Sequence, residues 1–372
     1  MNNTPIHYRF LRANGQGSFE EQLAQLLQSY IPAGIPVRFV FFDALPDNET
    51  YAICRNILMQ RVEERFADCV PVVSYVAQAP CNGRLSLEVH EVSSALADAV
   101  HYKEGYVTVE QPDYKYLFMG GVGGDSLNDS ISKQSDAVFR RVEAILQTET
   151  MPVSSIIRQW NYIERVVAVD SSGQQHYQAF NDSRSHFYDK ADWRQGYPAA
   201  TGIGTQWGGV MVDIDALVVT DGTVGIYPLD NPLQVPAHTY SGEVLLGNSQ
   251  KTTPKFERGK VIDFPDGRMV YVSGTAAIRG EQSLTGVGIE AQTRATLENI
   301  AYLLSARNLL ATGVEATCDT RLRLLRVYLK HAEDESAARC VIEEMAPSVS
   351  AFYVVADVCR NELLIEMEGI GF

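Results

Sequence analysis

Residues 358–368, VCRNELLIEME, have a counterpart near the other end of the chain, in residues 80–91, PCNGRLSLEVHE. In both stretches a glutamate follows a cysteine by seven positions, Glu366 after Cys359 and Glu88 after Cys81. Each glutamate lies among alternating apolar and polar residues, which is typical of a half-buried strand. The shared spacing indicates that one chain makes the same strand twice.

The residues around the second stretch predict an ordered series of strands and helices. Four segments have the apolar and β-branched composition of strands, and they are residues 268–278, 321–330, 350–358 and 362–370. Residues 289–308 keep apolar side chains at helical spacing along one face, and residues 335–345 predict a second helix. The expected order is strand, helix, strand, helix, strand, strand.

The same order can be followed twice more along the chain. In the N-terminal part the segments are 7–13, 18–31, 37–44, 49–66, 70–77 and 84–92, and a capping box from Ser18 to Glu21 begins the first helix. In the middle they are 115–122, 135–147, 153–163, 173–188, 197–205 and 209–218, and Asp213 falls where the other copies have Glu88 and Glu366. We therefore predict an α+β protein of three repeats, each a mixed sheet with two helices on one face.

These repeats predict the domain organisation. We place an N-terminal repeat at 1–92, a middle repeat at 113–218 and a C-terminal repeat with the active site at 268–372. Residues 93–112 and 219–267 are expected to be a connection and a connecting insert. Three similar units in one chain predict a monomer with internal pseudo-threefold symmetry, an intramolecular pseudo-trimer, and with clefts between units, where pockets usually form.

Composition restricts the classes of function. The hydrophobic fraction of 45% and the charged fraction of 21% are those of an ordinary globular protein. Nothing at the start of the chain is typical of a signal peptide, and no apolar run is long enough for a membrane span, so we expect a cytoplasmic protein. The six cysteines lack CxxC spacing and fit free thiols.

Charge and histidine spacing narrow the possible ligands. The net charge of −15 disfavours nucleic-acid binding, and an anionic ligand would need a few locally placed arginines. The seven histidines show neither HxxxH nor HxH spacing, so we expect no metal ion.

Several motifs resemble known families. VSGTA (272–276), AQTRATLENI (291–300), LRVYLK (325–330) and IEMEGIG (365–371), within the repeated unit, resemble the RidA/YjgF family. Members of that family are trimers with sites between subunits, and many of them deaminate reactive imines. A more specific resemblance, from about residue 110 to the end, is to the chorismatases, in which a RidA-like fold acts on chorismate. It is carried by RQWNYI (158–163), YQAFNDSR (177–184), YPAATGIGT (197–205), NPLQVPAHTY (231–240), VSGTAAI (272–278) and ADVCRNELLIEME (356–368).

The chorismatase resemblance implies a reaction without a cofactor. Chorismate carries two carboxylates and an enolpyruvyl ether, and cleavage of the ether requires a proton on the vinyl carbon. The products would be pyruvate and either 3-hydroxybenzoate or a dihydroxycyclohexadiene carboxylate. A carboxylic acid can supply the proton if an apolar setting raises its pKa. Glu366 matches the proton donor of the family, whereas Glu88 and Asp213 match no family position and are expected to be structural.

Other positions are assigned to substrate binding. Arg158 in RQWNYI is the predicted carboxylate anchor, because a guanidinium group matches a carboxylate bidentately. Tyr240 and Thr253 resemble hydroxyl donors to the second carboxylate. Gly274 and Thr275, in the SGTA stretch, are assigned to the substrate site. Arg258 and Arg360 are second choices for an anchor, with a structural role expected for each.

Cys359 is grouped with Glu366 in the catalytic set, although it is not expected to be a nucleophile. No histidine lies near it in the sequence to activate the thiol. Within the resemblance, a cysteine here together with Gly274 marks the subgroup that makes 3-hydroxybenzoate. The two residues would shape the ring pocket and steer the product by admitting or excluding a water molecule.

Two departures from the families leave alternatives open. RidA deaminases hold the substrate carboxylate with an arginine, and this chain has Ala351 at about that position. Chorismatases commonly have a histidine where this chain has Glu281, in GEQS (280–283). One alternative is an inactive RidA-like binding protein. The other is an imine deaminase, which an arginine from a neighbouring repeat in the Glu366 cleft would favour. A buried Glu366 facing Arg158 would favour chorismate.

Overall fold

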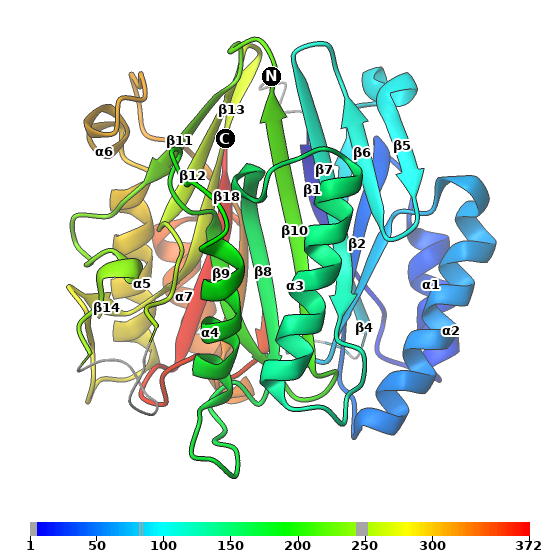
Figure 1. Ribbon diagram of the computed structural model, residues 1–372. Coiled ribbons are helices and arrows are strands. Elements are labelled where there is room, and N and C mark those ends of the chain that lie inside the picture. Colours follow the sequence, from blue (N-terminus) through cyan, green and yellow to red (C-terminus); the bar gives the residue numbers. More distant parts are fainter. Residues whose placement is uncertain (1–5, 82, 84, 243–251) are drawn as a thin grey trace.

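Three sheets with one strand order form the centre of the chain in the computed structural model, which describes residues 6–81, 83, 85–242 and 252–372 (Figure 1). In each sheet the last of the four strands of the predicted repeat lies between the first and the second of the four. The second and third of these four strands run parallel, and their other neighbours are antiparallel. The predicted repetition of one α+β unit is therefore confirmed at the level of strand order.

The N-terminal unit has the order β1-β4-β2-β3. Its elements are β1 (Ile6–Arg12), α1 (Phe19–Ser29), β2 (Ile35–Asp43), α2 (Asn48–Phe66), β3 (Val72–Val76) and β4 (Leu85–Val92). The predicted capping box begins α1, because the Ser18 hydroxyl accepts from Glu21 N and the Glu21 carboxylate accepts from Ser18 N.

The middle unit has the order β5-β6-β7-β10-β8-β9. Its elements are β5 (Val100–Lys103), β6 (Tyr106–Glu110), β7 (Tyr114–Gly123), α3 (Ile131–Thr148), β8 (Ile156–Glu164), α4 (His176–Tyr188), β9 (Ala199–Thr205) and β10 (Val210–Val219).

The C-terminal unit has the order β11-β12-β13-β18-β16-β17, beside a small hairpin of β14 and β15. Its elements are β11 (Gly225–Leu229), β12 (Gly259–Phe264), β13 (Gly267–Ala276), β14 (Ile278–Arg279), β15 (Gln282–Ser283), α5 (Ile289–Leu303), α6 (Ala306–Ala311), β16 (Leu322–Leu329), α7 (Glu335–Met345), β17 (Ser350–Val355) and β18 (Ile365–Gly371).

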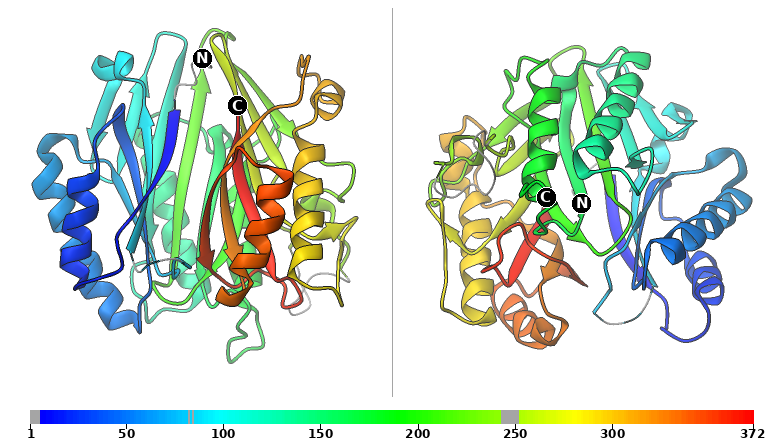
Figure 2. Two further views of the ribbon diagram at one scale, coloured as in Figure 1. Left: turned by 180° about the vertical axis from the view of Figure 1, so that it is seen from behind. Right: turned by 60° about the horizontal axis from the view of Figure 1, so that its bottom comes forward.

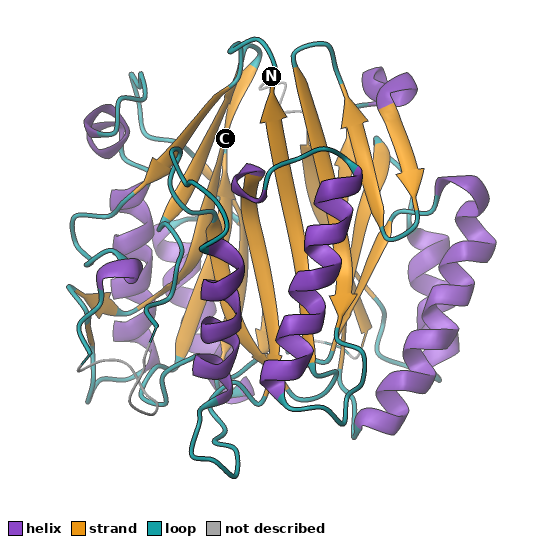
Figure 3. Cartoon of the chain, in the orientation of Figure 1, coloured by secondary structure: helices purple, strands orange, loops and turns teal. Residues whose placement is uncertain are grey.

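The sheets face one another across a shared core, and the helices lie outside them (Figures 2 and 3). The shared core includes Val40 of β2, Trp160 of β8 and Tyr271 of β13, one residue from each unit. On the opposite face, alternate side chains such as Val212 and Met367 pack under the helices of their own unit. Strand alternation thus gives each sheet one face for its helices and one for its neighbours.

Buried ion pairs join the three units in a ring. The second strand of each repeat, β2, β8 or β16, carries an arginine at the same position. In the sheet register Arg38 lies opposite His90, Arg158 opposite Asp215 and Arg326 opposite Glu368. Each arginine pairs with a carboxylate of another unit, and the pairs are Arg38–Asp215 (2.7 Å), Arg158–Glu368 (2.5 Å) and Arg326–Glu88 (2.8 Å). Removal of one partner from such a buried pair typically costs about 3–5 kcal/mol. The ring therefore fixes the units against one another.

Several predicted boundaries were wrong. Residues 93–112 and 219–267, expected to be connections, contain β5, β6, β11 and β12, which extend two of the sheets. These strands are short, and residues 243–251 lie outside the described residues. The predicted helix 289–308 ends at Leu303, because Ser305 caps a separate helix, α6. The predicted strand 362–370 begins at Ile365, because Arg360 O accepts from Leu363 N in a turn before it.

No helix in the described part of the chain is long and apolar enough to cross a bilayer.

Candidate active site

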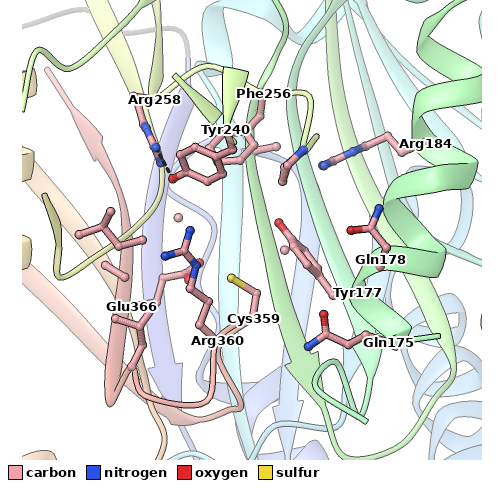
Figure 4. A pocket seen from close by; sticks show the side chains of 17 residues that line it. Gln175, Tyr177, Gln178, Arg184, Tyr240, Phe256, Arg258, Cys359, Arg360 and Glu366 are labelled. Atoms are coloured by element: carbon pink, nitrogen blue, oxygen red, sulfur yellow. Dashed lines mark hydrogen bonds between the residues drawn. The ribbon is translucent and has the colours of Figure 1, made fainter. Parts of the chain in front are cut away.

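A cavity lies between the middle and C-terminal units, where α4 and β9 face β13 and β18 (Figure 4). It contains about 810 Å³ of empty space, open solvent at the mouth included. Glu366, Cys359 and Arg360 approach the cavity from one side, and Tyr177 and Arg184 approach it from the other. This is the cleft between units in which the sequence placed Glu366.

Strand alternation turns the Glu366 side chain into this cavity. Its neighbours Ile365 and Met367 pack under the helices, so Glu366 and Glu368 take the opposite face of β18. Glu366 is 5% exposed, and no hydrogen bond from the described residues reaches its carboxyl group. Burial and, to a smaller extent, the negative charge of Glu368 raise its pKa to about 8. At neutral pH this carboxyl is protonated and can donate its proton.

Gly274 provides the space for the Glu366 carboxyl. A side chain at position 274 would place its Cβ well inside van der Waals contact with Glu366 Oε1 and 3.1 Å from Thr201 Cγ2. The register of β13 against β18 shifts between Val272 and Thr275, which puts Gly274 at an irregularity of the ladder. Its N–H donates to Thr201 Oγ1 at 3.0 Å. A side chain at this position would therefore displace the Glu366 carboxyl from its present place.

Three arginines line the cavity, and each is held by a neighbour. Arg184 Nη2 donates to Asn181 Oδ1 at 2.6 Å, Arg258 Nη2 to the Tyr240 hydroxyl at 2.6 Å and Arg360 Nη1 to Glu281 O at 2.9 Å. Glu366 is the one acidic side chain among the described lining residues. With that group protonated, the cavity carries three positive charges inside a chain of net charge −15. Such a cluster can bind a dianion.

Aromatic side chains form part of the wall. Tyr177 fits against Gly202, where a Cβ would lie 2.8 Å from the tyrosine ring. Tyr240 and Phe256 flank Arg258, whose guanidinium carbon lies 5.6 Å and 5.4 Å from their ring centres. Flat rings around guanidinium groups suit a flat, cyclic anion.

Cys359 lines the cavity as a thiol. Burial and the nearby charge of Glu366 raise its pKa to about 12, so the thiolate does not form near neutral pH. Cys359 therefore lies in the wall of the cavity, and its non-nucleophilic role stays a prediction.

Several predicted binding residues lie outside the cavity. Arg158 is 1% exposed and donates to Thr201 Oγ1 at 2.8 Å and to Glu368 at 2.5 Å, so its charge is committed to the central ring. Thr253 donates to His238 O and Thr275 to Ser273 O, and neither lines the cavity. The positions of these three residues contradict their prediction as direct substrate contacts.

The arginines that do line the cavity were ranked too low or missed. Arg258 and Arg360 were expected to be structural. Arg184 was not considered, although it closes the quoted motif YQAFNDSR. It follows Tyr177 by seven residues on α4, which is two helical turns, so both side chains share one face. That spacing was the available signal.

Glu281, the departure from the chorismatase pattern, does not line the cavity. Its carboxylate accepts from Ser241 N at 2.9 Å and Ser241 Oγ at 2.8 Å, and these bonds lower its pKa. Its carbonyl oxygen accepts from Arg360. The added carboxylate is therefore directed to the segment after Tyr240, whereas Arg360 is held by the main-chain carbonyl of Glu281.

The two related carboxylates have other partners. Asp213 is fully buried and accepts from Ser74 Oγ at 2.5 Å and Gly121 N at 2.8 Å. Burial disfavours the charged form of Glu88, yet Arg326 beside it lowers its pKa to about 2. Position 75 on β3 corresponds to position 202 on β9, so the N-terminal unit has a tyrosine where the middle unit has the glycine that lines the Glu366 cavity. Burial raises the pKa of Asp213, but neither Asp213 nor Glu88 lines the cavity that Glu366 faces.

Comparison with known proteins gives consistent relatives. The family model described as Chorismatase FkbO/Hyg5-like, N-terminal, matches residues 91–216. A 3-hydroxybenzoate synthase from Streptomyces hygroscopicus is 33% identical over 230 residues, which are 60% of this chain and 65% of that protein. A chorismatase from Streptomyces rapamycinicus is 28% identical over 275 residues, which are 72% of this chain and 77% of that protein.

A crystal structure of a chorismatase matches this fold with a TM-score of 0.72 at 20% identity, covering 99% of this chain and 98% of the other. The match extends over all three units and confirms the expected α+β fold class of repeated mixed sheets. The alignment with the 3-hydroxybenzoate synthase covers just under two thirds of that protein.

Proposed function

We propose that this chain is a member of the chorismatase family and that it cleaves the enolpyruvyl ether of chorismate and releases pyruvate. The observation that carries the proposal is the Glu366 carboxyl, buried, protonated at neutral pH and facing a cavity lined by three arginines.

The first step is proton transfer from Glu366 to the vinyl carbon of the substrate. The carboxyl O–H bond breaks, a C–H bond forms with the electron pair of the vinyl group, and the ether carbon becomes oxocarbenium-like. A carboxylic acid with a pKa of about 8 is present in its acid form at neutral pH, as general acid catalysis requires. Cleavage of the ether with overall addition of water gives pyruvate and a dihydroxycyclohexadiene carboxylate, whereas conversion to pyruvate and 3-hydroxybenzoate needs no net water.

The two substrate carboxylates bind the arginines. Arg258 and Arg360 belong to the unit that carries Glu366, and Arg184 belongs to the middle unit. Anchors from both sides of the cleft can hold the two ends of a dianion and orient the enolpyruvyl group toward Glu366. Tyr240, held by Arg258, can direct its hydroxyl group to the same carboxylate.

We assign 3-hydroxybenzoate as the aromatic product. Gly274 and Cys359, the pair that marks this subgroup in the family resemblance, both line the cavity with Glu366. The similarity to a protein named 3-hydroxybenzoate synthase supports the same assignment. A small glycine and a thiol leave an apolar wall beside the ring, which disfavours a bound attacking water.

One observation favours a second candidate, an imine deaminase. Arg184 brings an arginine from the neighbouring unit into the Glu366 cleft, which is the feature that would replace the arginine absent at Ala351. Three arginines exceed the need of a substrate with one carboxylate, so chorismate remains the better match.

The test is incubation of the purified protein with chorismate, with pyruvate followed by coupled reduction and the aromatic products separated. We expect pyruvate above the spontaneous rate together with 3-hydroxybenzoate. A second incubation with an imine generated from an amino acid addresses the rival. Accelerated release of ammonia there, without pyruvate from chorismate, would replace the proposal by deamination.

A further inference from the structure

Two buried charged side chains, Glu368 and Arg158, lie near Glu366. Glu368 follows it by two residues and takes the same face of β18. Its Oε1 accepts from Trp160 Nε1 and the Tyr328 hydroxyl, both at 3.0 Å, and its Oε2 accepts from Arg158 at 2.5 Å. Arg326 Nη1 also lies 2.9 Å from Glu368 Oε1, so two arginines and two neutral donors surround this carboxylate. The Glu368 carboxylate therefore lies on the same face of β18 as the proton donor, two residues away.

Arg158 reaches the same donor by another route. Its Nη2 donates to Thr201 Oγ1, which also accepts from Gly274 N. The Glu366 carboxyl occupies the space that the absent side chain of Gly274 leaves beside Thr201. Within the described residues, Arg158 Nη1 is buried without a hydrogen-bond partner. Arg158 is thus linked through Thr201 to the place that the Glu366 carboxyl occupies.

We propose that Glu368 and Arg158 are positioning residues that act on Glu366 with opposite sign and together set the pH at which it releases its proton. Glu368 repels the carboxylate and keeps Glu366 in its acid form until the vinyl carbon takes the proton. Arg158 stabilises the carboxylate that remains after this transfer. The inference rests on the proposed function, and it gives the ring of ion pairs a role in the chemistry.

Other ionisable groups line the same cavity. The cations are Arg258 before β12, Arg360 before β18 and Arg184 of α4. The thiol and hydroxyls are those of Cys359, Tyr177 and Tyr240, with Tyr328 opposite on β16. Burial holds the pKa of Cys359 at about 12 and raises those of Tyr177 and Tyr328.

Lys260 of β12 also titrates near neutral pH. Burial lowers the pKa of Lys260 to about 7, but its ammonium group donates to Gln195 O and Gly196 O, outside the cavity. If Lys260 caused the alkaline decline in the pH profile of kcat/KM, that decline would not move when Glu368 is replaced. The comparison of variants therefore separates the two groups.

The experiment is the pH dependence of kcat/KM for pyruvate release in the wild type, Glu368→Gln and Arg158→Met. The alkaline limb should move to lower pH by about one unit in Glu368→Gln and to higher pH in Arg158→Met. Glu88→Gln is the matched control, because Glu88 pairs with Arg326 as Glu368 does but belongs to another unit. Its limb should coincide with that of the wild type. The proposal would be overturned if the alkaline limb of the pH profile stayed in place in Glu368→Gln and Arg158→Met, or if it moved in the same direction in both.

A second measurement does not depend on turnover. The carboxyl infrared band of Glu366, assigned by subtraction of the Glu366→Gln spectrum, is titrated in each folded variant. Glu368→Asp keeps the charge and should restore a titration close to that of the wild type, which a merely structural role for Glu368 would not require. If the wild type releases no pyruvate, the proposed function fails, and this titration still decides whether Glu368 and Arg158 act on Glu366.

Discussion

Replacement of the proton donor by its neutral analogue, Glu366→Gln, is expected to raise the unfolding free energy relative to that of the wild type, and to raise it more as the pH increases. In the folded chain Glu366 keeps its proton up to a pH of about 8, because burial and Glu368 disfavour its charge. In the unfolded chain the same group releases its proton near its ordinary pKa of 4.5. Between these values the folded wild type binds one more proton than the unfolded chain, so its stability falls as the pH rises.

The size of the effect follows from the two pKa values. Each pH unit in this window costs the wild type about 1.4 kcal/mol, and the loss from pH 5 to pH 7 amounts to about 2.5 kcal/mol. The glutamine variant lacks this loss. Any constant cost of burying the amide group cancels, because it is the same at every pH.

The assay is urea denaturation of the wild type and Glu366→Gln at pH 5, 6 and 7. The difference in unfolding free energy should change in favour of the variant by about 2.5 kcal/mol over this range. Glu104→Gln, at an exposed glutamate, is the control and should follow the wild type. Parallel curves for the wild type and Glu366→Gln would refute the reasoning, because Glu366 would then titrate alike in both states.

Three further predictions concern the cavity. Gly274→Ala should lower pyruvate release at least about tenfold, because its Cβ displaces the proton-donating carboxyl, whereas Gly288→Ala, with no neighbour within 4 Å of its Cβ, should leave the rate unchanged. Cys359→Ala should keep pyruvate release within about threefold of the wild type, since no thiolate is needed, while chromatography shows less 3-hydroxybenzoate and more of the hydrolytic product; loss of all turnover would contradict this. Arg258→Met should reduce kcat/KM about 10- to 100-fold through a lost carboxylate contact, with the exposed Arg307→Met as its control; equal values for the two variants would refute the assignment.

The repeated unit could be predicted because its signals are local. Strand alternation, helical periodicity and the Ser18 capping box are short-range patterns, and they located the main elements of all three units. The strands of the two presumed connections were missed because they are short and gain their stability from the sheets that they extend.

The site could be predicted only in part. Glu366, Cys359, Gly274 and Tyr240 were identified and share one cavity. Alternation cannot tell which of two inward-facing polar residues reaches a cavity and which reaches an ion pair, so Arg158 was misassigned.

The most direct test of the account compares chorismate-dependent pyruvate release by the wild type and Glu366→Gln at pH 7, with Glu88→Gln as the control for a carboxylate of the same strand position in another unit. The account predicts pyruvate release by the wild type and Glu88→Gln and its loss in folded Glu366→Gln, because Glu366 alone among the three related carboxylates faces the cavity in acid form. Undiminished pyruvate release by Glu366→Gln would contradict it.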